Sequence, residues 1–297
     1  MAKLDLIQPL ISKISKGKNW RRFCLCLLPF VFSFVIGSCS SGALLDQAQT
    51  AWDGGDYAMA AERYERFLKD NPRSEQAAYA RFRVAMICYR DLKQYDRAIE
   101  HYIHLIDDFP KSAEIYQARL RLAECYAFTR KQREAINEYE IALPLAPDVK
   151  ERRRVQLSIG ELYYEMDDLG QALAEFQKAL GADGYDEIDE RASLRMGGIR
   201  YLRNEYKDAL ASYDLVSVKT QDSSIRRIAR LAMADCYERM SQYDVAVKLL
   251  EATEPDPNSP DYIRKRIASI RELQRMRYLN PPSSPTFSKV RVKPKRT

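Results

Sequence analysis

The stretch QYDRAIEHYIHLIDDFP, residues 94–110, decides the fold because it recurs along the chain. GDYAMAAERYERFLKDNP precedes it at residues 55–72, and KQREAINEYEIALPLAP follows it at residues 131–147. The alanine in the first part of each phrase marks a register with a step of 38 and then 37 residues, and six positions fit it: Ala60, Ala98, Ala135, Ala172, Ala209 and Ala246. A step of this size is typical of an array of small structural repeats.

Three further positions recur in the same register. Four residues after each alanine stands a large apolar or aromatic residue: Tyr64, Tyr102, Tyr139, Phe176, Tyr213 and Leu250. Nine residues before it stand Ala51, Tyr89, Tyr126, Tyr163, Arg200 and Tyr237, and twelve before it a small or slim residue: Ala48, Met86, Ala123, Gly160, Gly197 and Ala234. Two helices cross closely only where their side chains are small, so each repeat is predicted to be a helix-turn-helix pair.

This pattern resembles the tetratricopeptide repeat, in which a small residue, Tyr, Ala, an aromatic and a closing Pro recur, as in Ala123, Tyr126, Ala135, Tyr139 and Pro147. The resemblance implies an all-α protein, an α-solenoid of about six repeats over residues 43–258. Such solenoids act as scaffolds for protein partners. Residues 259–279 are predicted to form a capping helix with Ser259 as N-cap and Pro260 at the first helical position. Residues 280–297, rich in Pro, Ser and basic residues, are predicted to be a disordered tail.

The N-terminal segment carries a second signal. Residues 1–22 are basic, and Phe23–Ile36 is apolar except for Ser33, which together predict a secretory signal peptide over residues 1–38. Its end, Ile36-Gly37-Ser38-Cys39, resembles the lipobox of bacterial lipoproteins. That resemblance implies cleavage before Cys39 and lipidation of this cysteine. The alternative is an ordinary signal peptide with an incidental cysteine. The linker to the repeats, residues 39–42, spans at most about 11–14 Å.

Charge argues against a nucleic-acid partner. Of the net charge of +6, residues 1–38 contribute +5 and residues 281–297 another +5, so the body between them carries −4. A folded region without excess positive charge has no means of releasing counterions from a phosphate backbone. The basic tail is instead a candidate for contact with anionic lipid or peptidoglycan.

No pattern of catalytic, cofactor-binding or metal-binding residues stands out, and the chain is predicted not to be an enzyme. Cys88, Cys125 and Cys236 recur in one repeat position, which indicates packing residues too far apart to form disulfides. His101 and His104 lie three residues apart and could hold a metal with Asp107 or Asp108. The preferred interpretation places both histidines on a solvated convex face.

A binding groove is predicted on the concave face, which the first helices of the repeats would line. An extended or helical peptide held by apolar anchors would suit such a groove. The candidate groove residues are Trp52, Arg83, Ile87, Arg90, Phe128, Tyr164 and Tyr201. Leucines of the first helices lie beside these residues. The alternative role for these leucines is to complete the packing between neighbouring repeats.

The phrases KDNPRSEQAAYARFRVA and DDFPKSAEIYQARLRLAE, between Lys69 and Glu124, resemble BamD-like lipoproteins of the outer-membrane β-barrel assembly machinery. The resemblance implies a lipid-anchored protein on the periplasmic face of the outer membrane with protein partners in barrel assembly. The same phrases also resemble the Tol–Pal coordinator, and pilus-secretin pilotins are likewise lipidated repeat proteins. An envelope adaptor that binds cell-wall or secretion components is therefore the alternative.

Overall fold

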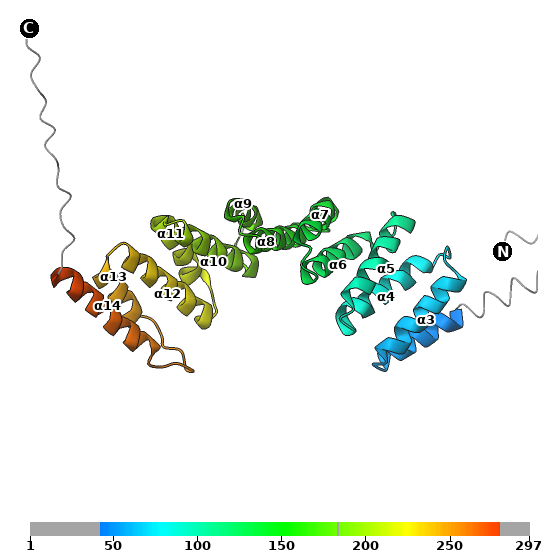
Figure 1. The fold of residues 1–297 in the computed structure, drawn as a ribbon, viewed down its shortest axis with the longest axis horizontal. Coiled ribbons are helices and arrows are strands. Elements are labelled where there is room, and N and C mark those ends of the chain that lie inside the picture. The colour runs from blue at the N-terminus through cyan, green and yellow to red at the C-terminus, as the bar shows by residue number, and fades with distance from the viewer. Residues whose placement is uncertain (1–41, 183, 280–297) are drawn as a thin grey trace, which may run out of the picture. The chain divides into compact units, whose positions relative to one another are not determined.

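A computed structural model describes residues 42–182 and 184–279, and these residues form helices joined by short turns (Figure 1). The leader, Cys39 and the tail lie outside the described residues. The chain divides into two compact units, residues 1–146 and 147–297. The predicted all-α fold of helix pairs is confirmed. In the described part of the chain, no helix is both long enough and apolar enough to cross a membrane.

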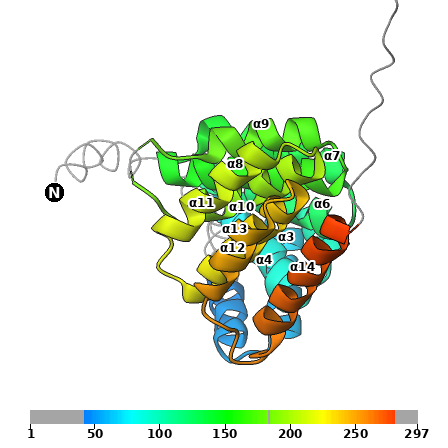
Figure 2. The same ribbon diagram turned by 90° about the vertical axis from the view of Figure 1, so that its left-hand side faces the viewer.

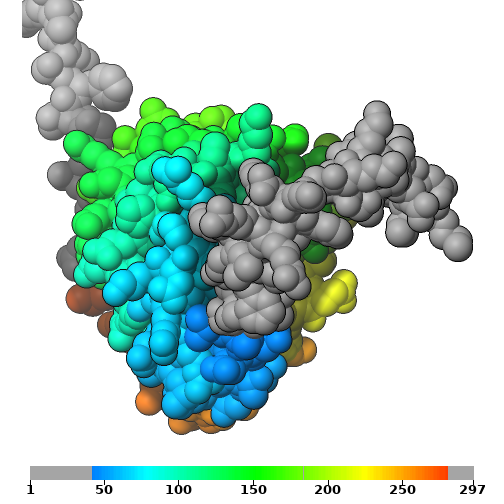
Figure 3. Space-filling view, turned by 90° about the vertical axis from the view of Figure 1, so that its right-hand side faces the viewer, coloured from blue at the N-terminus to red at the C-terminus, as the bar shows by residue number. Residues whose placement is uncertain are grey.

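The described residues of unit 1 form three helix pairs. The first pair is a helix over residues 42–53 with α3 (Tyr57–Asp70), which lie side by side on the face shown in Figure 3. The second pair is α4 (Ala77–Met86), continued by the π-helix η1 (Ile87–Asp91), with α5 (Tyr95–Asp108). The third is α6 (Ile115–Phe128) with α7 (Gln132–Ala142) and a short 3-10 turn, η2 (Leu143–Leu145). Within this unit, each α-helix from α3 onward packs on the next.

In unit 2, residues 147–182 and 184–279 form three more pairs and one terminal helix. The pairs are α8 (Val149–Glu165) with α9 (Leu169–Ala179), α10 (Glu187–Leu202) with α11 (Tyr206–Lys219), and α12 (Ser223–Arg239) with α13 (Tyr243–Glu251). The terminal helix α14 (Tyr262–Leu279) packs against α13 at the end of the unit (Figure 2).

The repeat register is confirmed by burial. All six register alanines are fully buried, and the large residues four positions later are at most 7% exposed. In α8 and α10 the small residue is glycine, because the aromatic ring of the following helix lies directly against it. A Cβ on Gly160 would lie 2.7 Å from the Phe176 ring, and one on Gly197 would lie 2.6 Å from the Tyr213 ring. The smallest side chains thus set the helix crossing.

The turn inside each pair repeats in the same register. Five residues before each alanine, one residue adopts a positive φ of 56–81°: Gly55, Lys93, Arg130, Asp167, Asn204 and Ser241. A left-handed residue of this kind commonly ends a helix, and glycine is its preferred type. Only the first repeat has glycine there, so the other five turns carry a conformational cost that glycine would lower.

The first helix of the second pair departs from the predicted register by one residue. ARFRVA at residues 80–85 aligns with ARLRLA at residues 118–123, which makes the fully buried Ala85, and not the half-buried Met86, the small crossing residue. The π-helix that follows takes up the additional residue. This single insertion explains why the first step of the repeat is 38 residues and the others are 37.

The start of the terminal helix also differs from the prediction. Ser259 pairs with Asp256 in an isolated β-bridge and Pro260 lies in a turn, so α14 begins only at Tyr262. The buried Ile270 occupies the register position of Met233, 37 residues earlier. Arg271 therefore stands where Ala234 crosses its partner helix, and its guanidinium pairs with Glu251 of α13 at 2.8 Å. A long charged side chain at the crossing position prevents another helix from packing closely.

Candidate protein-interaction surfaces

Trp52 is the centre of the candidate surface in unit 1. The Arg83 guanidinium lies 3.8 Å from the centroid of its half-buried ring, and the Arg90 guanidinium lies 5.3 Å from it. The indole Nε1–H donates a long hydrogen bond of 3.4 Å to Oδ2 of Asp91. Stacking on arginine and this hydrogen bond hold the indole in one orientation. We call Trp52, Arg83, Arg90 and Asp91 the Trp52 cluster.

The two arginines of the Trp52 cluster differ in their charge balance. Arg90 pairs with Asp91 at 2.9 Å. Arg83 donates instead to the neutral Oε1 of Gln49 at 2.8 Å, and within the described residues it forms no ion pair with a carboxylate. A half-buried guanidinium that is hydrogen-bonded only to neutral groups keeps its full charge available to an anionic group of a partner.

The π-helix places half of the Trp52 cluster. Arg90 and Asp91 are the last two residues of η1, and the inserted residue turns them relative to the preceding helix α4. π-Helical insertions occur frequently at functional sites because they re-aim side chains without ending the helix. The insertion thus brings Asp91 within reach of the Trp52 indole.

Ile87, which sequence reasoning placed in the groove, is only 1% exposed and lies in the core of unit 1. The same insertion explains this correction, since the predicted register had no π-turn. A side chain without exposed surface cannot contact a partner, and Ile87 is removed from the candidate surface.

Phe128 lies in a second aromatic cluster of unit 1. It is 58% exposed and stacks on Tyr95 with ring centroids 4.8 Å apart, and Tyr89 lies 6.3 Å from it. Arg121 in turn lies over the Tyr89 ring at 5.9 Å. Phe128 therefore packs on the start of α5, at a turn between paired helices.

In unit 2, an arginine covers each of Tyr164 and Tyr201. In both cases the arginine comes from the first helix of the following pair. Arg195 lies 5.1 Å above the Tyr164 ring. Arg239 lies 5.8 Å from the Tyr201 ring, and its Nε donates to the Tyr201 hydroxyl at 2.9 Å. Both aromatics are half-buried, so each offers one edge and part of a face to a partner.

A polar pocket of about 440 Å³ adjoins Tyr201. Two of its lining residues, Asp235 and Glu238, give this end of unit 2 an acidic character. Arg266 of α14 pairs with both carboxylates, at 2.6 Å and 2.7 Å. The terminal helix therefore neutralises this acidic end.

Sequence reasoning placed Arg83 in the groove, but it missed that arginines cover the aromatic rings. Arg83 on Trp52, Arg121 on Tyr89, Arg195 on Tyr164 and Arg239 on Tyr201 are four instances of one arrangement. A signal was present in unit 1, where Arg83 and Arg121 occupy the same place in ARFRVA and ARLRLA. In unit 2, Arg195 occupies the same place in ASLRMG at residues 192–197, two positions before Gly197, whereas Arg239 stands at a different repeat position.

In the part of the chain that the structure describes, the cysteines and histidines form no reactive or metal site. Cys88, Cys125 and Cys236 are free and fully buried, and burial raises the thiol pKa values to about 11, 12 and 11. The described residues contain no group of three or more possible metal ligands. His104 is exposed, but His101 is a correction: only 15% of its side chain is exposed, and its Nε2 lies 3.0 Å from Oε1 of Glu65.

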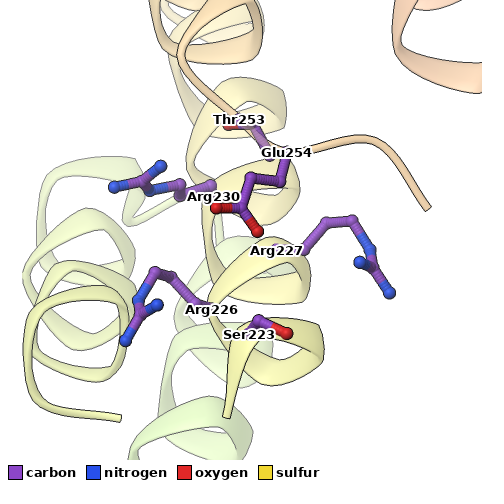
Figure 4. Close-up of a pocket in the computed structure, with 6 residues that line it drawn as sticks. All are labelled: Ser223, Arg226, Arg227, Arg230, Thr253 and Glu254. Carbon is purple, nitrogen blue, oxygen red and sulfur yellow. The ribbon is translucent and has the colours of Figure 1, made fainter. Parts of the chain in front are cut away.

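The arginine-rich pocket near the start of α12 resembles an anion site only in composition. Figure 4 shows Arg226 and Arg230 pointing to one side and Arg227 to the other. Arg226 donates to the backbone oxygens of Ser217 and Thr220, and Arg230 to that of Ala252. Arg226 and Arg230 therefore hydrogen-bond to the backbone at the ends of neighbouring helices. The three arginines do not converge on a common point where a ligand could bind.

Comparison with known proteins agrees with this architecture. Residues 45–113 match the family model described as Tetratricopeptide repeat. Residues 81–260, more than half of the chain, match the model described as Intraflagellar transport protein 56. No curated protein matches the chain.

Two solved structures have the same fold. A tetratricopeptide repeat protein from Parabacteroides merdae superposes with a TM-score of 0.54 at 18% identity, over 80% of this chain and 89% of that one. The C-terminal part of a TPR repeat-containing protein from Cytophaga hutchinsonii gives 0.55 at 17% identity, over 77% and 95%. The chain belongs to the tetratricopeptide repeat proteins and, over residues 81–260, to the family described as intraflagellar transport protein 56.

Proposed function

We propose that the protein is a lipid-anchored interaction scaffold on the periplasmic face of the outer membrane, where it holds a protein partner in β-barrel assembly. Tetratricopeptide repeat proteins are generally non-catalytic scaffolds for protein partners, and this supports the coarser part of the proposal. The family matches begin at residue 45. They therefore support the scaffold function and do not test the leader or the lipid anchor. The location follows from the signal-like leader and the lipobox-like sequence that ends at Cys39.

The observation that carries the scaffold function is the Trp52 cluster. An aromatic ring in contact with two guanidinium groups combines apolar area, directional hydrogen bonding and, on Arg83, a charge that has no carboxylate partner among the described residues. Binding energy at protein interfaces concentrates in such Trp and Arg residues. The cluster therefore suits a peptide segment that brings an apolar side chain to the Trp52 ring and an acidic group to Arg83.

The position of Trp52 along the chain supports work at the membrane. Its helix begins by residue 42, directly after the linker that follows Cys39. Because that linker spans at most about 11–14 Å, a lipid on Cys39 would hold the first repeat near the headgroups. A partner at the membrane surface is then within reach of the cluster.

Co-purification in mild detergent tests the proposal. The native chain is expected to retain an outer-membrane assembly protein, and Trp52→Ala is expected to lose at least tenfold of it, because truncated hot-spot residues cost about 2 kcal/mol or more. Met59→Ala, which removes an exposed apolar side chain of α3, is the matched control and should retain the partner. Recovery of a secretin or of cell-wall fragments in place of an assembly protein would overturn the barrel-assembly assignment.

Lipidation is tested separately. Cys39→Ser is expected to abolish labelling by an alkyne fatty acid and to leave the chain uncleaved or soluble. Unchanged labelling of this variant would overturn the anchor, whatever the partner proves to be.

A further inference from the structure

The terminal helix α14 carries more charge than its packing uses. It has six basic residues and one acidic residue in 18 positions. Arg264, Arg266 and Arg271 pair with carboxylates of the protein. Lys265 and Arg275 are exposed and form no ion pair among the described residues. The helix thus presents an uncompensated positive field to solvent.

The same helix exposes an apolar stripe. Tyr262, Leu273, Met276 and Leu279 are 45–62% exposed. The first three share one face with the small, exposed Ser269, because the four residues follow one another at steps of seven, four and three positions and each position turns the helix by about 100°. That face is different from the one that buries Ile263 and Ile270 against the unit. Leu279 and Lys265 flank the stripe.

The outer face of α14 does not suit a further helix, for chemical reasons. A helix continuing the array would have to cross at Arg271, which lies on the side of α14 opposite the stripe and whose side chain is too long for a close crossing, so such a helix would not cover the stripe. A second copy of α14 would bring two sets of excess positive charge together, and like charges that face each other are destabilising. An apolar stripe also offers nothing to a polyanion that lacks apolar groups.

We propose that the outer face of α14 docks on an anionic lipid surface. Tyr262, Leu273, Met276 and Leu279 would enter the boundary between headgroups and acyl chains, and Lys265 and Arg275 would contact lipid phosphates. Apolar side chains interspersed with bases are the pattern of helices that lie in the membrane interface. The surrounding sequence adds to the attraction, since residues 281–297 carry five bases and no acid.

A fluorophore on α14 tests the docking directly. Ser269→Cys, labelled in the full chain, reports contact with lipid through quenching by brominated acyl chains in phosphatidylcholine vesicles with or without phosphatidylglycerol. Ala211→Cys on the exposed side of α11 is the matched control site, again a small exposed residue of a helix. The three native cysteines of the described repeats are buried, and the chain without an added cysteine gives the blank. Quenching is expected at residue 269, only with phosphatidylglycerol, and not at residue 211.

Two pairs of substitutions separate the contributions. Lys265→Gln with Arg275→Gln should lower the docking equilibrium roughly thirty-fold, since each base near an anionic surface contributes about 1 kcal/mol. Leu273→Gln with Met276→Gln should abolish quenching. Leu215→Gln with Val218→Gln, an exposed apolar pair on α11 with the same spacing, should leave it intact. All replaced side chains are exposed, so the helical content of each variant should equal that of the native chain.

The proposal is overturned by equal quenching at residues 269 and 211, by quenching that does not depend on phosphatidylglycerol, or by quenching that survives the double charge substitution. Capture of an acidic protein by α14 in the absence of lipid contact would also overturn it. The vesicles contain no protein partner, so this result is independent of the Trp52 cluster and of the proposed function.

Discussion

At the scale of single residues, the left-handed turn position has the most direct consequence for stability. Lys93 has a φ of 56° and is exposed, so Lys93→Gly relieves a conformation that costs a side-chain-bearing residue about 1–2 kcal/mol. The net gain should be about 0.5–1 kcal/mol because glycine also loses more entropy on folding. Urea unfolding followed by circular dichroism measures it. Gly55→Ala is the reverse change, and a Cβ there meets nothing within 4 Å, so it should destabilise by a similar amount. Shifts of the same sign in both variants would contradict the turn assignment.

The contact between α3 and α5 gives a prediction about pH. The hydrogen bond from His101 is the main cause that lowers the pKa of Glu65 below its ordinary 4.5, and Arg97 adds to it against the opposing effect of burial. A carboxyl with a lowered folded-state pKa contributes stability that is present above pH 4.5 and lost as the pH falls through the folded value. The difference in unfolding free energy between the native chain and Glu65→Gln should therefore shrink from pH 5 to pH 3. Glu62→Gln, at an exposed site on the same helix, should show no such trend. A difference that stays constant down to pH 3 would mean that the charge of Glu65 is not what stabilises the contact.

At the scale of helices, the crossing in the fifth repeat supplies a matched pair of glycines. Gly197→Ala should cost about 1–3 kcal/mol, because its Cβ would lie 2.6 Å from the buried Tyr213 ring. Gly198→Ala in the same helix meets only the Tyr213 hydroxyl at 3.8 Å. It should stabilise the protein by about 0.5–1 kcal/mol, the usual gain from replacing a helical glycine. Thermal unfolding of both variants decides the matter, and a loss at residue 198 as large as at residue 197 would refute the crossing geometry.

The π-helix gives the second prediction at this scale. Deletion of Met86 leaves Ala85 followed by Ile87 and Cys88, which matches the spacing of Ala123, Glu124 and Cys125 in the next repeat. The chain should then fold with a continuous α-helix and similar helical content. Arg90 and Asp91 would rotate away from Trp52, so Trp52 fluorescence should shift and partner capture should fall as in Trp52→Ala. Full capture by a folded deletion variant would mean that the insertion plays no part in binding.

The sequence predicted the repeats well because burial follows a strict period there. The register alanines and the rings that fill the space beside them are confirmed, since each depends only on its distance along one helix pair. Ile87 was misplaced because a single inserted residue turns every later side chain, and a π-turn has no composition of its own. Ser259 has the residue type of an N-cap, but its backbone pairs with Asp256 instead. The covering of Trp52 by Arg83 depends on contacts between repeats, which a period within one repeat does not specify.

At the scale of the whole molecule, the proposed scaffold holds its protein partner through the Trp52 cluster, on the first-helix surface of unit 1. The most direct measurement places a photo-reactive phenylalanine analogue at Tyr79, which is 43% exposed and 5.7 Å from the Arg83 guanidinium. Irradiation of intact cell envelopes should cross-link this residue to one outer-membrane assembly protein. Trp52→Ala should abolish the cross-link and Met59→Ala should preserve it. A cross-link that persists in Trp52→Ala, or the absence of any protein cross-link at Tyr79, would show that the Trp52 cluster does not hold the partner.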